Sequence, residues 1–102
     1  MAKGYWIAQV DVEDMERYGA YSALIGKALA PFGGRFLVRG GRREDVEGAV
    51  RSRSIVIEFD SYERALACWH SPAYQAIVPL RAGAALADIV VVEGVSADQA
   101  PA

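Results

Sequence analysis

The alternation of apolar and polar residues is clearest in residues 53–61. One face of this segment carries Ile55, Ile57 and Phe59, while the opposite face mixes an apolar residue with the carboxylate of Glu58. The pattern predicts a strand at the centre of a sheet. Its mixed face is expected to cover a cavity or the sheet of another subunit rather than a helix.

Three further segments have strand patterns, at residues 4–11, 34–39 and 86–95. The first has apolar residues on both faces, which is typical of an interior strand. In the second, strict alternation places Arg39 on the face that looks away from the helices, the same face as Glu58.

The glycine pair Gly40-Gly41 follows the second strand and predicts a bulge or a bend, because glycine weakens a regular strand. Residues 42–52 are expected to form a polar hairpin connection, in which strand pairing can extend to Val46.

An amphipathic helix is predicted over residues 15–32, with Glu13 or Asp14 as its N-cap. Its apolar residues recur at spacings of three, four and seven, as expected for one face of a helix: Tyr18, Tyr21, Ile25, Ala28, Leu29 and Phe32. Gly33-Gly34 ends it.

A broken helix is expected between the third and fourth strands. Ser61 caps its first part, and Ser71-Pro72 restarts it, because serine caps well and proline suits the first helical position. Pro79 is placed to kink the second part. Tyr74 and Arg81 lie seven residues apart and therefore share a helical face.

The order strand, helix, strand, strand, helix, strand predicts an α+β fold, the ferredoxin-like βαββαβ plait with a four-stranded antiparallel sheet. Its helices would cover one face of the sheet and leave the other open and apolar. Because a monomer rarely exposes such a face, we expect a homodimer that forms through it. The plait would occupy residues 1–95, and residues 96–102 would form a disordered tail.

Composition narrows the possible functions. The 102 residues fit one domain, and a formal charge of -2 argues against a nucleic-acid partner. No segment reaches the roughly 20 apolar residues that span a bilayer, and the start of the chain lacks a signal-peptide pattern, so we expect a cytoplasmic protein without a membrane partner. Cys68 is the single cysteine and is interpreted as a core residue. One histidine and scattered carboxylates predict no metal site, and no cofactor is expected.

Several segments together resemble one family. They are GYWIAQVDV, GGRFLVRGG, IVIEFDS, ALACWHSPAYQAIVPLRAGA and IVVVEGV, and they cover nearly the whole chain. They are similar to the family called domain of unknown function 1330, of the dimeric α+β barrel superfamily. The resemblance implies a homodimer in which two open sheet faces enclose a barrel. The wider superfamily includes cofactor-independent monooxygenases, isomerases and haem enzymes, so it leaves the reaction open.

The candidate site residues are of two kinds. Some have a charged or polar group that is costly to bury alone, and others share one face of a strand or helix. The residues expected near a ligand are Trp6, Tyr18, Arg39, Glu58, Tyr74 and Arg81. Glu58 and His70 are the candidate proton acceptors if the protein is an enzyme.

Three functions remain open from the sequence. The leading hypothesis is a homodimer that binds a small, partly apolar molecule, either between sheet and helices or inside the dimer barrel. The second is a cofactor-independent monooxygenase or isomerase that uses Glu58 or His70. The third is a dimer without a ligand that serves as an interaction module.

Overall fold

The computed structural model describes residues 2–96 and has the predicted order of strands and helices. The elements are β1 (Gly4–Val12), α1 (Met15–Leu29), the 3-10 helix η1 (Ala30–Phe32), β2 (Arg35–Arg39), β3 (Arg53–Phe59), α2 (Tyr62–His70), α3 (Pro72–Arg81) and β4 (Ala85–Glu93). The tail predicted to be disordered lies outside the described residues, apart from Ser96.

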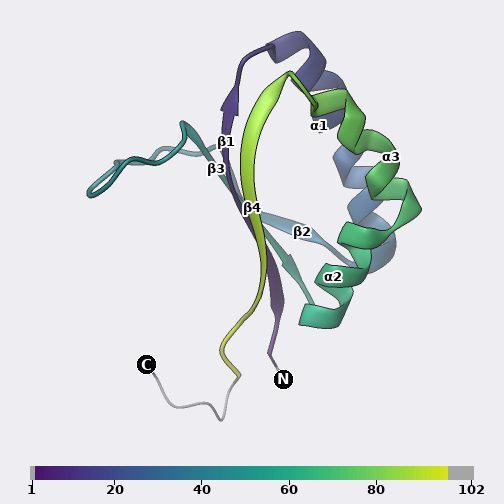
Figure 1. Ribbon diagram of the computed structural model, residues 1–102. Coiled ribbons are helices and arrows are strands. Elements are labelled where there is room, and N and C mark those ends of the chain that lie inside the picture. Colours follow the sequence, from purple (N-terminus) through teal and green to yellow (C-terminus); the bar gives the residue numbers. More distant parts are fainter. Residues whose placement is uncertain (1, 97–102) are drawn as a thin grey trace.

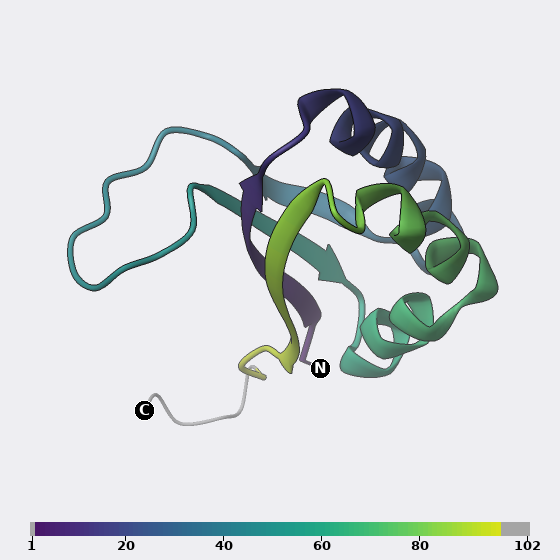
Figure 2. The same cartoon turned by 45° about the horizontal axis from the view of Figure 1, so that its top comes forward.

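The sheet has the strand order β2-β3-β1-β4, and each neighbouring pair is antiparallel. The predicted central strands β1 and β3 are therefore confirmed. All the helices lie on one side of the sheet (Figures 1 and 2), as expected for the ferredoxin-like α+β fold. We call the uncovered side the open face.

A β-bulge in β2 changes which residues face the helices. Phe36 pairs with Ile57, but the register shifts before Val38, so that Arg39 pairs with Ile55. Arg39 thus shares the helix-covered face with Ile55 and Ile57. The prediction that Arg39 lies on the open face with Glu58 was wrong, because one extra residue in a strand reverses every later side chain.

The bulge precedes the glycine pair instead of coinciding with it. Gly40 has a φ of 69° and donates a backbone hydrogen bond to the Ser54 carbonyl, so it forms the bend that ends β2. Strand pairing does not extend to Val46, which is 85% exposed. Residues 41–52 form a long loop that extends to the open-face side of the sheet (Figure 1).

Each predicted helix start is confirmed by a side-chain cap. The oxygens of Asp14, Ser61 and Ser71 accept hydrogen bonds from the backbone N–H three residues onward. The first helix ends earlier than predicted, at Leu29, and tightens into η1, which contains Pro31. Gly33, with a φ of 71°, then turns the chain into β2.

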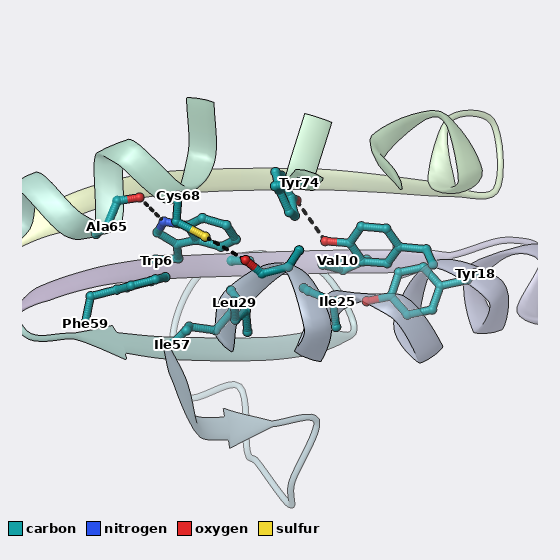
Figure 3. Packing of buried hydrophobic residues seen from close by; sticks show 13 residues of the cluster. Trp6, Val10, Tyr18, Ile25, Leu29, Ile57, Phe59, Ala65, Cys68 and Tyr74 are labelled. Carbon is teal, nitrogen blue, oxygen red and sulfur yellow. Dashed lines mark hydrogen bonds between the residues drawn. The ribbon is translucent and has the colours of Figure 1, made fainter. Parts of the chain in front are cut away.

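The core fills the space between the sheet and the helices (Figure 3). Trp6 lies near its centre, with the ring centroids of Tyr74 and Phe59 at 4.8 and 5.3 Å. The Trp6 indole N–H donates to the Ala65 carbonyl at 2.8 Å, which satisfies its polar atom. The open face instead exposes aliphatic side chains, namely Ile7, Val38, Leu86, Val90 and Val92.

We expect two glycine-to-alanine substitutions to have opposite effects on stability. A Cβ on Gly4 would collide with the backbone of Ser61 and Tyr62, whereas a Cβ on Gly26 would meet open space on α1. Gly4→Ala should lower the free energy of unfolding by about 1–3 kcal/mol. Gly26→Ala should raise it by about 0.5–1 kcal/mol. Urea titrations at one protein concentration measure both, and a neutral Gly4→Ala would contradict the close packing of β1 on the start of α2.

Candidate functional site

A small pocket, which we call the inner cavity, lies between the sheet and the helix pair α1 and α3. It has a volume of about 30 Å³. All four strands and both helices contribute apolar and aromatic side chains to it: Trp6, Ala8, Val10, Tyr18, Tyr21, Ile25, Phe36, Ile55, Ile57, Tyr74, Ala87 and Ile89. The polar residues in its lining are Ser22, Arg39, Arg53 and Arg81.

A wider space, the outer groove, adjoins the inner cavity. It has a volume of about 410 Å³ and lies between α1 and the base of the loop after β2. Three residues line both spaces, namely Tyr18, Ser22 and Arg53. The remaining lining of the groove is Val12, Met15, Gly19, Gly40, Gly41 and Ser52. The two spaces are therefore neighbours in the fold.

Two tyrosine hydroxyls meet at the wall of the inner cavity. Tyr21 on α1 and Tyr74 on α3 have hydroxyl oxygens 2.8 Å apart, and both side chains are buried (Figure 3 shows the bond from Tyr74). Burial, and then the neighbouring Tyr74, raise the pKa of Tyr21 far above its ordinary value. Tyr21 is therefore neutral at physiological pH and acts as a hydrogen-bonding group.

The Arg81 side chain lies against this tyrosine pair. One guanidinium nitrogen is 3.5 Å from the Tyr74 hydroxyl, and the guanidinium carbon is 5.4 Å from the centre of the Tyr21 ring. The face shared by Tyr74 and Arg81, predicted from their spacing, is confirmed by this contact.

Two other arginines come from the sheet. The Arg39 guanidinium lies 4.2 Å from the centre of the Phe36 ring and donates to the carbonyl and hydroxyl oxygens of Ser22 at 3.2 and 3.1 Å. Arg53 begins β3 and packs over the Gly40 bend, where a Cβ would collide with its guanidinium. The bulge in β2 and the glycine after it thus position two cations at the cavity.

Glu58 lies on the opposite face of the sheet from this cavity. It accepts hydrogen bonds from the Tyr5 hydroxyl at 3.0 Å and from Arg35 at 2.9 Å, and Arg35 also contacts Asp60. Hydrogen bonds from Arg35 and Tyr5 lower the pKa of Glu58 below its ordinary value. The carboxylate is therefore already paired and stays ionised near neutral pH.

His70 and Cys68 also lie outside the cavity lining. His70 is exposed at the end of α2, beside a shallow surface depression formed with Trp69 and Ile89. Cys68 is buried, its thiol contacts the Ala28 carbonyl at 3.6 Å, and burial raises its pKa to about 11. Such a thiol is a poor nucleophile, in line with a core role.

The structure brings together five of the six residues expected near a ligand. Trp6, Tyr18, Arg39, Tyr74 and Arg81 all line the inner cavity, and Glu58 does not.

Sequence reasoning missed Tyr21 and Arg53 as lining residues, although the signal was present for both. Arg53 has the same alternation as Ile55 and Ile57, and Tyr21 belongs to the apolar stripe of α1.

Within residues 2–96, no helix is long and apolar enough to cross a membrane. In the same range, no group of three or more His, Cys, Asp or Glu side chains is arranged to hold a metal ion.

The plait with one covered face places the protein in the ferredoxin-like α+β class. Within that class, the chain belongs to the family described as domain of unknown function DUF1330, whose model matches residues 3–95. No curated protein matches the sequence.

Solved structures with the same fold share little sequence with this chain. A protein of unknown function from Rhodopseudomonas palustris superposes with a TM-score of 0.72 at 16% identity, covering 93% of this chain and 84% of its own. The cofactor-independent oxygenase SnoaB from Streptomyces nogalater has a TM-score of 0.61 at 12% identity, covering 98% and 97%. A dimeric ferredoxin-like protein of unknown function from Thermobifida fusca has a TM-score of 0.57 at 16% identity, covering 90% and 89%. At these identities the similarity concerns the fold alone.

We expect Glu58→Gln to reduce stability in a pH-dependent way. Because the pKa of Glu58 is lower in the folded chain than its ordinary value of 4.5, the ionised group stabilises the fold above that pH. This contribution is lost as the pH falls through the lowered pKa that Glu58 has in the folded chain. The difference in unfolding free energy between wild type and Glu58→Gln should therefore be largest near pH 7 and shrink below pH 4.5, as measured by urea titration.

Glu44→Gln serves as the control, since Glu44 is exposed on the loop and forms no ion pair within residues 2–96. The difference in unfolding free energy between Glu44→Gln and wild type should stay near zero from pH 7 to pH 3. A Glu58→Gln difference that does not change between pH 7 and pH 3 would contradict the ion-pair role.

Proposed function

We propose that this protein is a homodimer that binds a small, partly apolar molecule in the inner cavity and outer groove. The observation that carries the proposal is the inner cavity, in which aromatic and aliphatic walls surround a few polar groups, together with the larger outer groove beside it. Binding sites for small molecules commonly have this composition and a volume of roughly 300–1,000 Å³. The outer groove, at about 410 Å³, falls in that range.

The open face supports the dimer. It exposes aliphatic residues from β1, β2 and β4, and a covering layer of helices is absent on that side among the described residues (Figure 2). A second copy of the same face would bury these side chains and leave polar groups at the rim. The structurally similar Thermobifida fusca protein is described as dimeric, which fits this proposal.

The loop after β2 also supports a partner on this side. Arg43 in the loop donates to Gln9 and Ser54 on the open face, at 3.0 Å in both cases. Arg51 forms ion pairs with Asp11 and Asp88 at 3.0 and 2.9 Å. These contacts hold the base of the loop beside the open face, so a second subunit placed there would meet the loop.

The geometry favours binding over a reaction that uses Glu58 or His70 as the base. A general base must lie within hydrogen-bonding distance of the proton that it removes. Glu58 is on the far side of the sheet and is already paired, and His70 lies outside the lining of the pocket. The open volume of the groove likewise favours a ligand-binding dimer over one without a ligand.

We expect Ile7→Glu to dissociate the dimer and Leu24→Glu to leave it intact. The two side chains are 38% and 39% exposed, but Ile7 lies on the open face and Leu24 on the outer surface of α1. A carboxylate at position 7 would be buried without a partner in the proposed interface, which costs several kcal/mol. Sedimentation velocity at micromolar concentration measures the result. A monomeric wild type, or an Ile7→Glu variant that remains dimeric, would contradict the proposed interface.

We expect protein purified from its own host to retain a small molecule in native mass spectrometry. Ala87→Leu should remove the added mass, because the larger side chain would project into the inner cavity. Ala67→Leu makes the same change at an exposed position of α2 and should retain it. Both variants should remain folded by circular dichroism. A bare wild-type subunit mass, or equal retention by both variants, would count against the pocket.

A further inference from the structure

The charges around the pocket are all of one sign. Three arginines line the inner cavity, Arg39, Arg53 and Arg81, and neither the cavity nor the outer groove has an Asp or Glu in its lining. This is notable in a chain whose formal net charge is -2. An apolar pocket with low-dielectric walls strengthens the field of these cations.

The three pocket arginines also differ from other arginines of the chain in their partners. Arg35, Arg43 and Arg51 each form an ion pair with a carboxylate at 3.2 Å or less. Within residues 2–96, the pocket arginines form no ion pair. Arg39 and Arg81 contact neutral groups, namely the oxygens of Ser22, the Tyr74 hydroxyl and the aromatic rings of Phe36 and Tyr21. Arg53 packs over Gly40.

Two of these arginines contain a buried donor without an acceptor. The Nε atoms of Arg53 and Arg81 are buried and have no hydrogen-bond partner among the described residues. A buried donor without a partner is destabilising, and more so when it carries charge, so folded proteins rarely leave one unsatisfied. The two residues belong to different elements, β3 and α3, and both line the inner cavity.

The size of the inner cavity limits which anion can enter it. At about 30 Å³ the cavity has room for one small group. A planar carboxylate is smaller than a tetrahedral phosphate and suits such a space better. Arginine guanidiniums also bind carboxylates through paired, charge-assisted hydrogen bonds. The outer groove, lined in part by Val12, Met15 and Tyr18, can then cover an apolar body.

We propose that the ligand is a small aromatic carboxylate, whose carboxylate binds between Arg53 and Arg81 while its ring lies toward the outer groove. Arg39, fixed on Ser22, adds a third positive charge at the cavity. This inference rests on the proposed binding function and specifies the class of its ligand.

The test compares carboxylates with neutral molecules of the same shape. Benzoate, phenylacetate and cinnamate are titrated by calorimetry against the wild-type protein, beside benzamide, phenylacetamide and cinnamamide. At least one carboxylate should bind ten times more tightly than its amide, and its affinity should fall as sodium chloride is added. Inorganic phosphate should neither bind comparably nor displace the carboxylate.

Substitutions at Arg53 and Arg81 test whether these two side chains bind the carboxylate. Arg53→Gln and Arg81→Gln should each weaken carboxylate binding about tenfold to a hundredfold, as expected for loss of a charge-assisted hydrogen bond. Neither should change amide binding appreciably. Arg64→Gln, which removes the same charge from an exposed position on α2, should have no effect. Arg53→Gln should melt no lower than wild type, because it removes an unsatisfied buried donor. Arg81→Gln also loses the contacts of Arg81 with Tyr74 and Tyr21, so it should melt slightly lower but remain folded.

The outcomes distinguish a failure of this inference from a failure of the proposed binding function on which it rests. Equal affinity for acids and amides would overturn the carboxylate assignment and leave the pocket in place. Tight, competing phosphate binding would overturn it in favour of a general anion site. If neither the carboxylates nor the amides bind, and native mass spectrometry shows the polypeptide without added mass, both proposals are overturned.

Discussion

The structure depends on one constraint: a four-stranded sheet has two faces, and residues 2–96 provide helices for only one of them. The covered face contains the aromatic core around Trp6, together with the pocket. The open face keeps aliphatic side chains in contact with solvent. Because a thin core of this kind leaves little stability in reserve, burial of the open face against a second subunit would matter for folding as well as for assembly.

The sheet also separates two kinds of charge. On the open face and at its rim, arginines are paired with carboxylates, as in the contacts of Arg35 with Glu58 and of Arg51 with Asp11. On the covered face, arginines contact hydroxyls and rings instead. Paired surface charges contribute little energy individually but favour one docking orientation. The two faces therefore suit different tasks, recognition of another polypeptide on one side and of a small molecule on the other.

Most of the fold could be predicted from the sequence because its signals are local. Alternation along residues 53–61, the apolar stripe of α1 and the capping residues Ser61 and Ser71 each specify an element from a few neighbouring positions. The candidate site was predicted less fully, since the face of Arg39 depends on a bulge that strict alternation cannot reveal. Glu58 does lie on the open face, as alternation predicted, and its grouping with Arg39 failed because the bulge moves Arg39 to the covered face. The empty volume depends on how side chains from six elements pack, and no local pattern specifies that.

The bulge in β2 makes the register of this strand a determinant of pocket chemistry. Leu37 is the residue left without a partner, which is why Phe36 and Arg39 face the same side although they are three positions apart. If all four residues from Phe36 onward paired regularly, Val38 would come opposite Ile55 beneath α1 and the Arg39 guanidinium would turn to the other side of the sheet. A slip of one residue at the sheet edge could thus change the charge of the cavity without substituting any residue that lines it.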